Sequence, residues 1–137
     1  MNLIHLFVAL LVVSFAMSCD PIPEAGPNCH KEIFIRNVST ETKFAALLPG
    51  TIEGIPCRNI PDRLEANDVI EFSLRPCWED EIDRGVYAGQ VLIFVLDSLP
   101  FETVAECDSI ELNQLTTNVI RLDLEELRQL DFTVDID

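Results

Sequence analysis

The sequence has few basic residues. Only 9 Lys and Arg stand against 24 Asp and Glu, so the formal net charge of the 137-residue chain is −15. No Asp, Glu, Lys or Arg occurs among residues 1–18, so a chain that loses this segment keeps the whole charge. Such a surface repels nucleic acid phosphates and anionic lipid headgroups. We therefore expect no nucleic acid partner, and we interpret the charge mainly as a source of solubility.

Histidine is also scarce, and the motifs of common enzymes are missing. Of the 2 histidines, only His30 lies beyond residue 18. No Gly-x-Ser-x-Gly motif and no zinc-type Cys-x-x-Cys or His-x-x-x-His spacing occurs. Cys29 precedes His30 directly, a spacing that seldom gives the geometry of a Cys–His catalytic pair. We expect no enzyme, no metal and no cofactor.

Tryptophan and tyrosine occur once each, close together and beside a run of acids. The candidate ligand-binding residues of this region are Trp78, Glu79, Asp80, Asp83 and Tyr87. An exposed Trp would suit the binding of a glycan. The carboxylates would suit a cation such as Ca²⁺, but Ile82 and Arg84 occupy positions where an EF-hand loop needs ligands. We expect a solvated acidic loop in which Trp78 covers a disulfide or caps the fold, with glycan or cation binding as the alternative.

Only one long apolar run is present, from Leu3 to Met17. It is shorter than the roughly 20 apolar residues of a transmembrane helix, and it fits the apolar part of a secretory signal. The residues Ala16-Met17-Ser18 and Cys19 resemble a loose bacterial lipobox, in which Cys19 would carry acyl chains such as palmitate. Ordinary signal peptidase cleavage after Ser18 is the alternative. We expect a signal peptide at residues 1–18 and lipid attachment at Cys19.

The chain has 5 cysteines, an odd number for an exported protein. Acylation of Cys19 would leave four cysteines that can pair: Cys29, Cys57, Cys77 and Cys107. Four cysteines allow three pairings, and the sequence alone leaves them open. Our preferred interpretation joins Cys57 to Cys77 and Cys29 to Cys107.

After Cys19, a Pro-rich segment at residues 19–28 is typical of an extended tether. Residues 29–137 then resemble one domain of short strands separated by turn residues. The segment Gln90–Asp97 is apolar on both faces and predicts a fully covered central strand. Phe132, Val134 and Ile136 alternate with polar residues, which predicts a last strand. Asp123 and Glu126 form a capping-box pattern for one short helix. These features predict a mainly β fold, a small antiparallel β-sandwich or curled sheet with one short helix near the C-terminus.

The C-terminal half resembles a known group of proteins. The stretches Arg75-x-Cys77-Trp78-Glu79, VLIFVLDSLPFETVAECDSI and NVIRLDLEELRQLDFTVDI are similar to small uncharacterised surface lipoproteins of Bacteroidetes. The resemblance covers roughly Arg75 to Asp137. Cys107 and Phe132 depart from it, because the group tends to have Trp at both positions. The resemblance implies a β-rich fold at the outer membrane or cell surface and assigns no catalytic residue.

Together these features predict an exported protein held to a membrane by its lipid. We expect a structural or interaction module at the outer membrane or cell surface, with other surface proteins as partners. The alternative is a glycan- or cation-binding module that uses the region from Trp78 to Tyr87.

Overall fold

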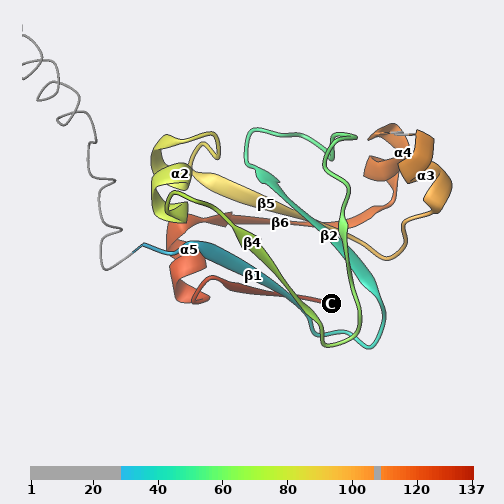
Figure 1. The fold of residues 1–137 in the computed structure, drawn as a ribbon, viewed down its shortest axis with the longest axis horizontal. Coiled ribbons are helices and arrows are strands. Elements are labelled where there is room, and N and C mark those ends of the chain that lie inside the picture. The colour runs from blue at the N-terminus through green and yellow to red at the C-terminus, as the bar shows by residue number, and fades with distance from the viewer. Residues whose placement is uncertain (1–28, 107–108) are drawn as a thin grey trace, which may run out of the picture.

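The computed structural model describes residues 29–106 and 109–137, which form two β-sheets and four short helices (Figure 1). One sheet has the order β4-β1-β7, with β1 at Glu32–Asn37, β4 at Val69–Ser73 and β7 at Thr133–Ile136. The other has the order β3-β2-β5-β6, with β2 at Lys43–Pro49, β3 at Asp62–Leu64, β5 at Gln90–Leu96 and β6 at Thr116–Asp123. The helices are α2 (Trp78–Arg84), α3 (Phe101–Glu106), α4 (Ser109–Gln114) and α5 (Leu124–Gln129). All neighbouring strands are antiparallel except β1 and β7, which are parallel.

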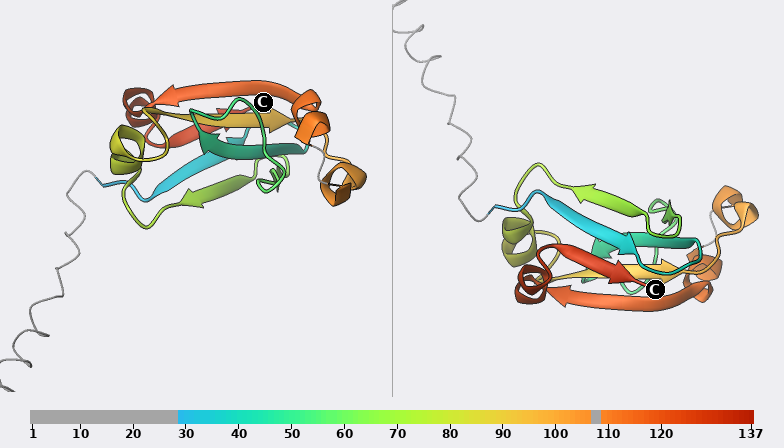
Figure 2. Two further views of the ribbon diagram at one scale, coloured as in Figure 1. Left: turned by 90° about the horizontal axis from the view of Figure 1, so that it is seen from above. Right: turned by 90° about the horizontal axis from the view of Figure 1, so that it is seen from below.

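The main core lies between the two sheets, which overlap in Figure 2. Alternate residues of β1 and β7 face it from the smaller sheet, and alternate residues of β2 and β5 face it from the larger one. The opposite face of the larger sheet is covered too. There, Leu92 and Leu96 of β5 pack with Ile55 of the β2–β3 connection and Leu112 of α4. The larger sheet is therefore enclosed on both faces, while the outer face of the smaller sheet is largely polar.

The mainly β architecture predicted from the sequence is confirmed. Residues Val91 to Leu96 are buried on both faces of β5, as the apolar run predicted. Phe132, Val134 and Ile136 are buried. The capping box is also present, since Asp123 accepts a hydrogen bond from the Glu126 amide and Glu126 accepts one from the Asp123 amide. These patterns could be read from the sequence because each depends on residues close together in the chain.

Three details differ from the interpretation of the sequence. The acidic stretch after Cys77 is not a loop but helix α2, whose buried residues Trp78 and Ile82 are one helical turn apart. The disulfide pairing also differs, because Cys77 is joined to Cys29 with a Cα–Cα distance of 5.1 Å. Cys57 is disulfide-bonded as well, so its partner is neither of these. More than the one expected helix is present, since α2, α3 and α4 precede α5.

Several expectations concern residues outside the described ranges. The signal peptide, the lipid attachment at Cys19 and the tether fall within residues 1–28, and Cys107 falls in the gap between α3 and α4. Among the residues that are described, no helix has the length and apolar character needed to cross a membrane.

Candidate functional site

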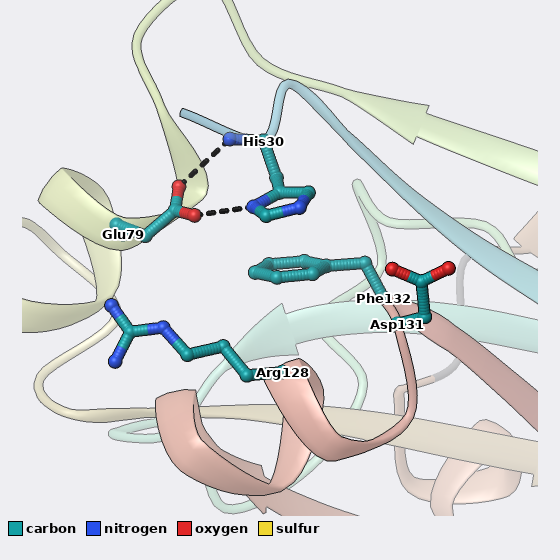
Figure 3. Close-up of a pocket in the computed structure, with 5 residues that line it drawn as sticks. All are labelled: His30, Glu79, Arg128, Asp131 and Phe132. Carbon is teal, nitrogen blue, oxygen red and sulfur yellow. Dashed lines mark hydrogen bonds and ion pairs between the residues drawn. The ribbon is translucent and has the colours of Figure 1, made fainter. Parts of the chain in front are cut away.

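Two hollows in the described surface are lined partly by α2 or by the turn that follows it. The first, which we call the His30 hollow, has a volume of about 480 Å³. It is lined by His30, Glu79, Arg128, Asp131 and Phe132 (Figure 3). His30 precedes β1, Glu79 belongs to α2, Arg128 belongs to α5, and the last two lie between α5 and β7. The site therefore joins the two ends of the described chain to α2.

A two-point hydrogen bond holds His30 against Glu79. The His30 backbone N–H donates to Glu79 Oε2 at 3.0 Å, and His30 Nδ1 lies 2.5 Å from Glu79 Oε1. Burial alone would raise the pKa of the Glu79 carboxyl, but the hydrogen bonds and charge of His30 outweigh it and hold the pKa below its ordinary value. Glu79 is therefore ionised at neutral pH, and Nδ1–H is the donor. The imidazole is fixed in one orientation.

Phe132 forms the floor under this pair. Its ring stacks on the His30 ring with a centroid distance of 3.9 Å and an interplanar angle of 14°. The position of Phe132 comes from the end of α5, where Asp131 and Phe132 both have positive φ values, 50° and 54°. The Phe132 amide donates to the Leu127 carbonyl at 2.9 Å and closes the helix. Non-glycine residues adopt this conformation at a cost, which the burial of Phe132 offsets.

The same corner carries the Cys29–Cys77 disulfide. Next to it, the Trp78 amide donates to the His30 carbonyl at 2.8 Å. The start of β1 is thus joined to α2 by a covalent bond, a backbone hydrogen bond and the His30–Glu79 pair. This concentration of contacts indicates that the corner holds the N-terminal side of the fold in place.

The polar groups of the His30 hollow are one imidazole, two carboxylates and one guanidinium. Its lining residues include no Ser, Thr or Cys. Arg128 reaches toward α2 on the same side of the Phe132 ring as Glu79, whereas Asp131 lies on the other side (Figure 3). Arg128 also lies 4.0 Å from Glu125, within its own helix. Most charge in this hollow is therefore already balanced by neighbouring protein groups.

The second hollow, which we call the Tyr87 hollow, has a volume of about 360 Å³. Its lining residues are Leu47, Leu48, Pro49, Ile52, Arg58, Asn59 and Tyr87. They come from the end of β2, the β2–β3 connection and the turn between α2 and β5. Burial, with a smaller contribution from the charge of Glu81, raises the pKa of the Tyr87 phenol. The hollow is therefore lined by aliphatic side chains together with one cation, one carboxamide and one phenol.

The five candidate residues of the acidic region do not form one site. Trp78 is only 1% exposed and donates its indole N–H to the Phe72 carbonyl at 3.2 Å, so it cannot stack on a glycan. Tyr87 packs edge to face on Trp78 and lines the second hollow, whereas Glu79 belongs to the first. Asp80 forms an exposed ion pair with Arg84. Asp83 is exposed on α2 and lines neither hollow.

Sequence reasoning missed most residues of both hollows. His30 and Glu79 are 49 positions apart, and no local pattern links them. Arg58 and Asn59 lie in a Pro-containing connection that carries no periodicity. The one available signal was the helical spacing of Trp78 and Ile82, which places Glu79 on a helix rather than in a loop.

No group of three or more potential metal-ligating side chains gathers within residues 29–106 and 109–137. Comparison of the chain with protein-family models, curated proteins and solved structures finds no match. The function therefore has to be argued from the geometry and the sequence alone.

Proposed function

We propose that the protein is an exported lipoprotein, held to the outer membrane or cell surface through Cys19, that presents its β-sandwich as an interaction module. The observation that carries this proposal is the use of the cysteines. Two disulfides, one at Cys29–Cys77 and one at Cys57, use four of the 5 cysteines and leave one. Disulfides are typical of exported proteins, and a single remaining cysteine at the end of a signal-like run suits acylation.

The identity of the remaining cysteine depends on the partner of Cys57, which is Cys19 or Cys107. The segment before Cys57 lies against α4, since the Ile55 amide donates to Asn113 Oδ1 at 2.7 Å. Cys107 precedes α4 by two positions, whereas Cys19 is far away in the sequence. We therefore propose a Cys57–Cys107 disulfide, which leaves Cys19 for the lipid. Peptide mapping under non-reducing conditions would identify this pairing.

The arrangement of the helices supports a role in interaction. Helices α2 and α5 lie at one end of the sandwich, beside the start of β1, and α3 and α4 lie at the opposite end (Figures 1 and 2). At that far end, Phe101 of α3 is 79% exposed. A large apolar side chain this exposed is available to a partner protein. Anchoring through the N-terminal side would leave α3 accessible.

Intact-mass measurement of the native protein extracted from membranes tests the anchor. We expect a chain that begins at Cys19, carries acyl groups and lacks two hydrogens for each of two disulfides. A matched pair of variants adds a second readout, because Cys19→Ser should leave the membrane fraction, whereas Ser18→Ala, which keeps the small residue before the cysteine, should stay. A native chain that keeps residues 1–18, or a lipid-free chain with reduced cysteines, would refute the proposal.

The interaction role has its own test. A photo-crosslinking amino acid in place of Phe101 should give a discrete adduct on intact cells, and the same group in place of exposed Arg121 on β6 should not. Equal adducts from both positions would show non-specific proximity and would contradict a partner at α3.

A further inference from the structure

The Tyr87 hollow has the size and lining of a small-ligand site. Its volume of about 360 Å³ lies near the lower end of the range for such sites, so it suits one ring-sized group. Its aliphatic lining residues are Leu47 and Leu48, which are buried, and Pro49 and Ile52, which are partly exposed, and its polar lining residues are Arg58, Asn59 and Tyr87. A lining that combines apolar side chains with a few polar groups can orient a small molecule.

The walls of this hollow are held in place before any ligand arrives. The Gly50 amide donates to the Gln90 carbonyl at 2.9 Å, and the Gln90 amide donates to the Tyr87 carbonyl at 3.1 Å. Position 50 needs glycine, because a Cβ there would lie 2.8 Å from the Gln90 carbonyl oxygen. The Tyr87 ring is braced by Trp78, with a centroid distance of 5.0 Å and an interplanar angle of 71°. A ligand would therefore meet a preformed surface and would lose little affinity to ordering.

Arg58 is a cation without an ion-pair partner among the described residues of a strongly acidic protein. Five of the 9 Lys and Arg side chains form ion pairs with Asp or Glu, namely Arg36, Lys43, Arg63, Arg84 and Arg128. Arg58 forms no ion pair with any residue in the described ranges, and it is an exposed residue that lines the hollow. Its guanidinium is free to take a carboxylate through two parallel hydrogen bonds.

We propose that the Tyr87 hollow binds a sugar residue that carries a carboxylate. The partly exposed Pro49 and Ile52 side chains and the Tyr87 ring suit the apolar face of a sugar ring, and Arg58 suits the carboxylate. The Asn59 carboxamide and the Tyr87 hydroxyl can both donate and accept hydrogen bonds, as ring hydroxyls require. A flat aromatic acid would form no hydrogen bonds with Asn59 and Tyr87 through its ring. A sugar acid can bond to both residues as well as to Arg58.

Titration of the full-length chain in detergent micelles with glucuronate tests the proposal. We expect saturable binding with a dissociation constant on the order of 1 mM, a usual strength for a small ligand with one charged contact. Arg58→Gln should weaken binding by about tenfold or more, because the paired charge is lost. Arg121→Gln is the matched control, since Arg121 is also exposed, forms no ion pair with a described residue and lies outside the hollow. The Arg121→Gln variant should bind glucuronate as tightly as the parent protein does.

Two further ligands decide the chemical class. Glucose should bind about tenfold more weakly than glucuronate and should not respond to Arg58→Gln. Benzoate should bind more weakly than glucuronate, and stronger benzoate binding would overturn the assignment to a sugar. Absence of saturable glucuronate binding, or equal binding to Arg58→Gln, would overturn the site itself.

The anchor and the ligand site are tested separately. Cys19→Ser should release the chain from the membrane and leave glucuronate binding unchanged, since the proposed contacts come from Arg58, Asn59 and Tyr87. Tyr87→Ala should also weaken binding, with a thermal unfolding curve to verify that the variant folds. If Tyr87→Ala is unfolded, Arg58→Gln still decides the outcome, because Arg58 is exposed.

Discussion

The His30 hollow and the Tyr87 hollow are built in opposite ways. In the first, the Glu79 carboxylate accepts two hydrogen bonds from His30, and the Cys29–Cys77 disulfide lies beside it. In the second, Arg58 has no acidic partner among the described residues, and aliphatic residues share the lining with Asn59 and Tyr87. Both have a volume suited to a small molecule, so size alone does not distinguish them.

The difference teaches how to separate a structural corner from a binding site. Charged groups that already satisfy each other stabilise the fold and gain little from a ligand, because a new partner must displace an existing one. A guanidinium without an acidic partner gains one when an anionic ligand binds. We therefore infer that the first hollow holds the fold together and that the second one is open to ligands. The following predictions test this division.

The largest effect should come from the disulfide. Replacement of both Cys29 and Cys77 by Ser should lower the free energy of unfolding by about 4 kcal/mol, because the bond closes a loop with a sequence separation of 48. Urea unfolding measures this loss. Amide hydrogen exchange should rise at Trp78, which donates to His30, and much less at Gly50, which donates to Gln90. An equal rise at both amides would show that the two hollows form one cooperative unit.

Phe132 should have the next largest effect. Phe132→Ala removes a ring that is 2% exposed and that supports His30, so we expect a loss of about 3–5 kcal/mol in urea unfolding. The matched control is Phe101→Ala, because Phe101 is 79% exposed and its removal should change stability by less than about 0.5 kcal/mol. A small effect at position 132 would mean that the His30 hollow is not a structural corner.

The Glu79 carboxylate should make stability depend on pH. Its pKa is lowered from the ordinary 4.5 in the folded chain, so its contribution is present above about pH 4.5 and is lost as the pH falls through the folded value. Glu79→Gln should remove about 1–2 kcal/mol at pH 7 and flatten this part of the profile. The control is Glu125→Gln, since Glu125 is exposed and lies 4.0 Å from Arg128. A profile that stays unchanged in Glu79→Gln would exclude a charged hydrogen bond at this position.

The sequence predicted the fold well where burial follows a local period. The apolar run of β5 and the alternation of Phe132, Val134 and Ile136 each reflect the face that a strand turns to the core. The capping box of α5 requires only Asp123 and Glu126, three positions apart. In these elements the sequence neighbours are also the structural neighbours.

The sites could not be predicted in the same way, because their residues meet through the packing of distant elements. Cys29 and Cys77 are 48 positions apart, and because the sequence allows three pairings our preferred one gave each of them a wrong partner. Helix α2 was missed because its acids dominate a short segment, although Trp78 and Ile82 had helical spacing. Arg58 stands out only once the lining of the Tyr87 hollow is known, since Arg121 also forms no ion pair with a described residue.

The smallest effects concern the turns that position each hollow, and they should differ in sign. Gly89 lies two residues after Tyr87 and has a φ of 87°. A Cβ added there would meet no atom within 4 Å, so the cost of Gly89→Ala is backbone strain alone. This strain should lower the free energy of unfolding by about 1 kcal/mol. Asp131, with a φ of 50°, already bears such strain, which Asp131→Gly should relieve. Glycine also gives the unfolded chain more freedom, so the net increase in the free energy of unfolding should be about 0.5 kcal/mol. Thermal unfolding measures both changes.

Gly89→Ala should also weaken glucuronate binding, because it disturbs the turn that carries Tyr87, whereas Asp131→Gly should leave binding unchanged. Weaker binding in Asp131→Gly would place the ligand in the His30 hollow and reverse the roles assigned to the two sites.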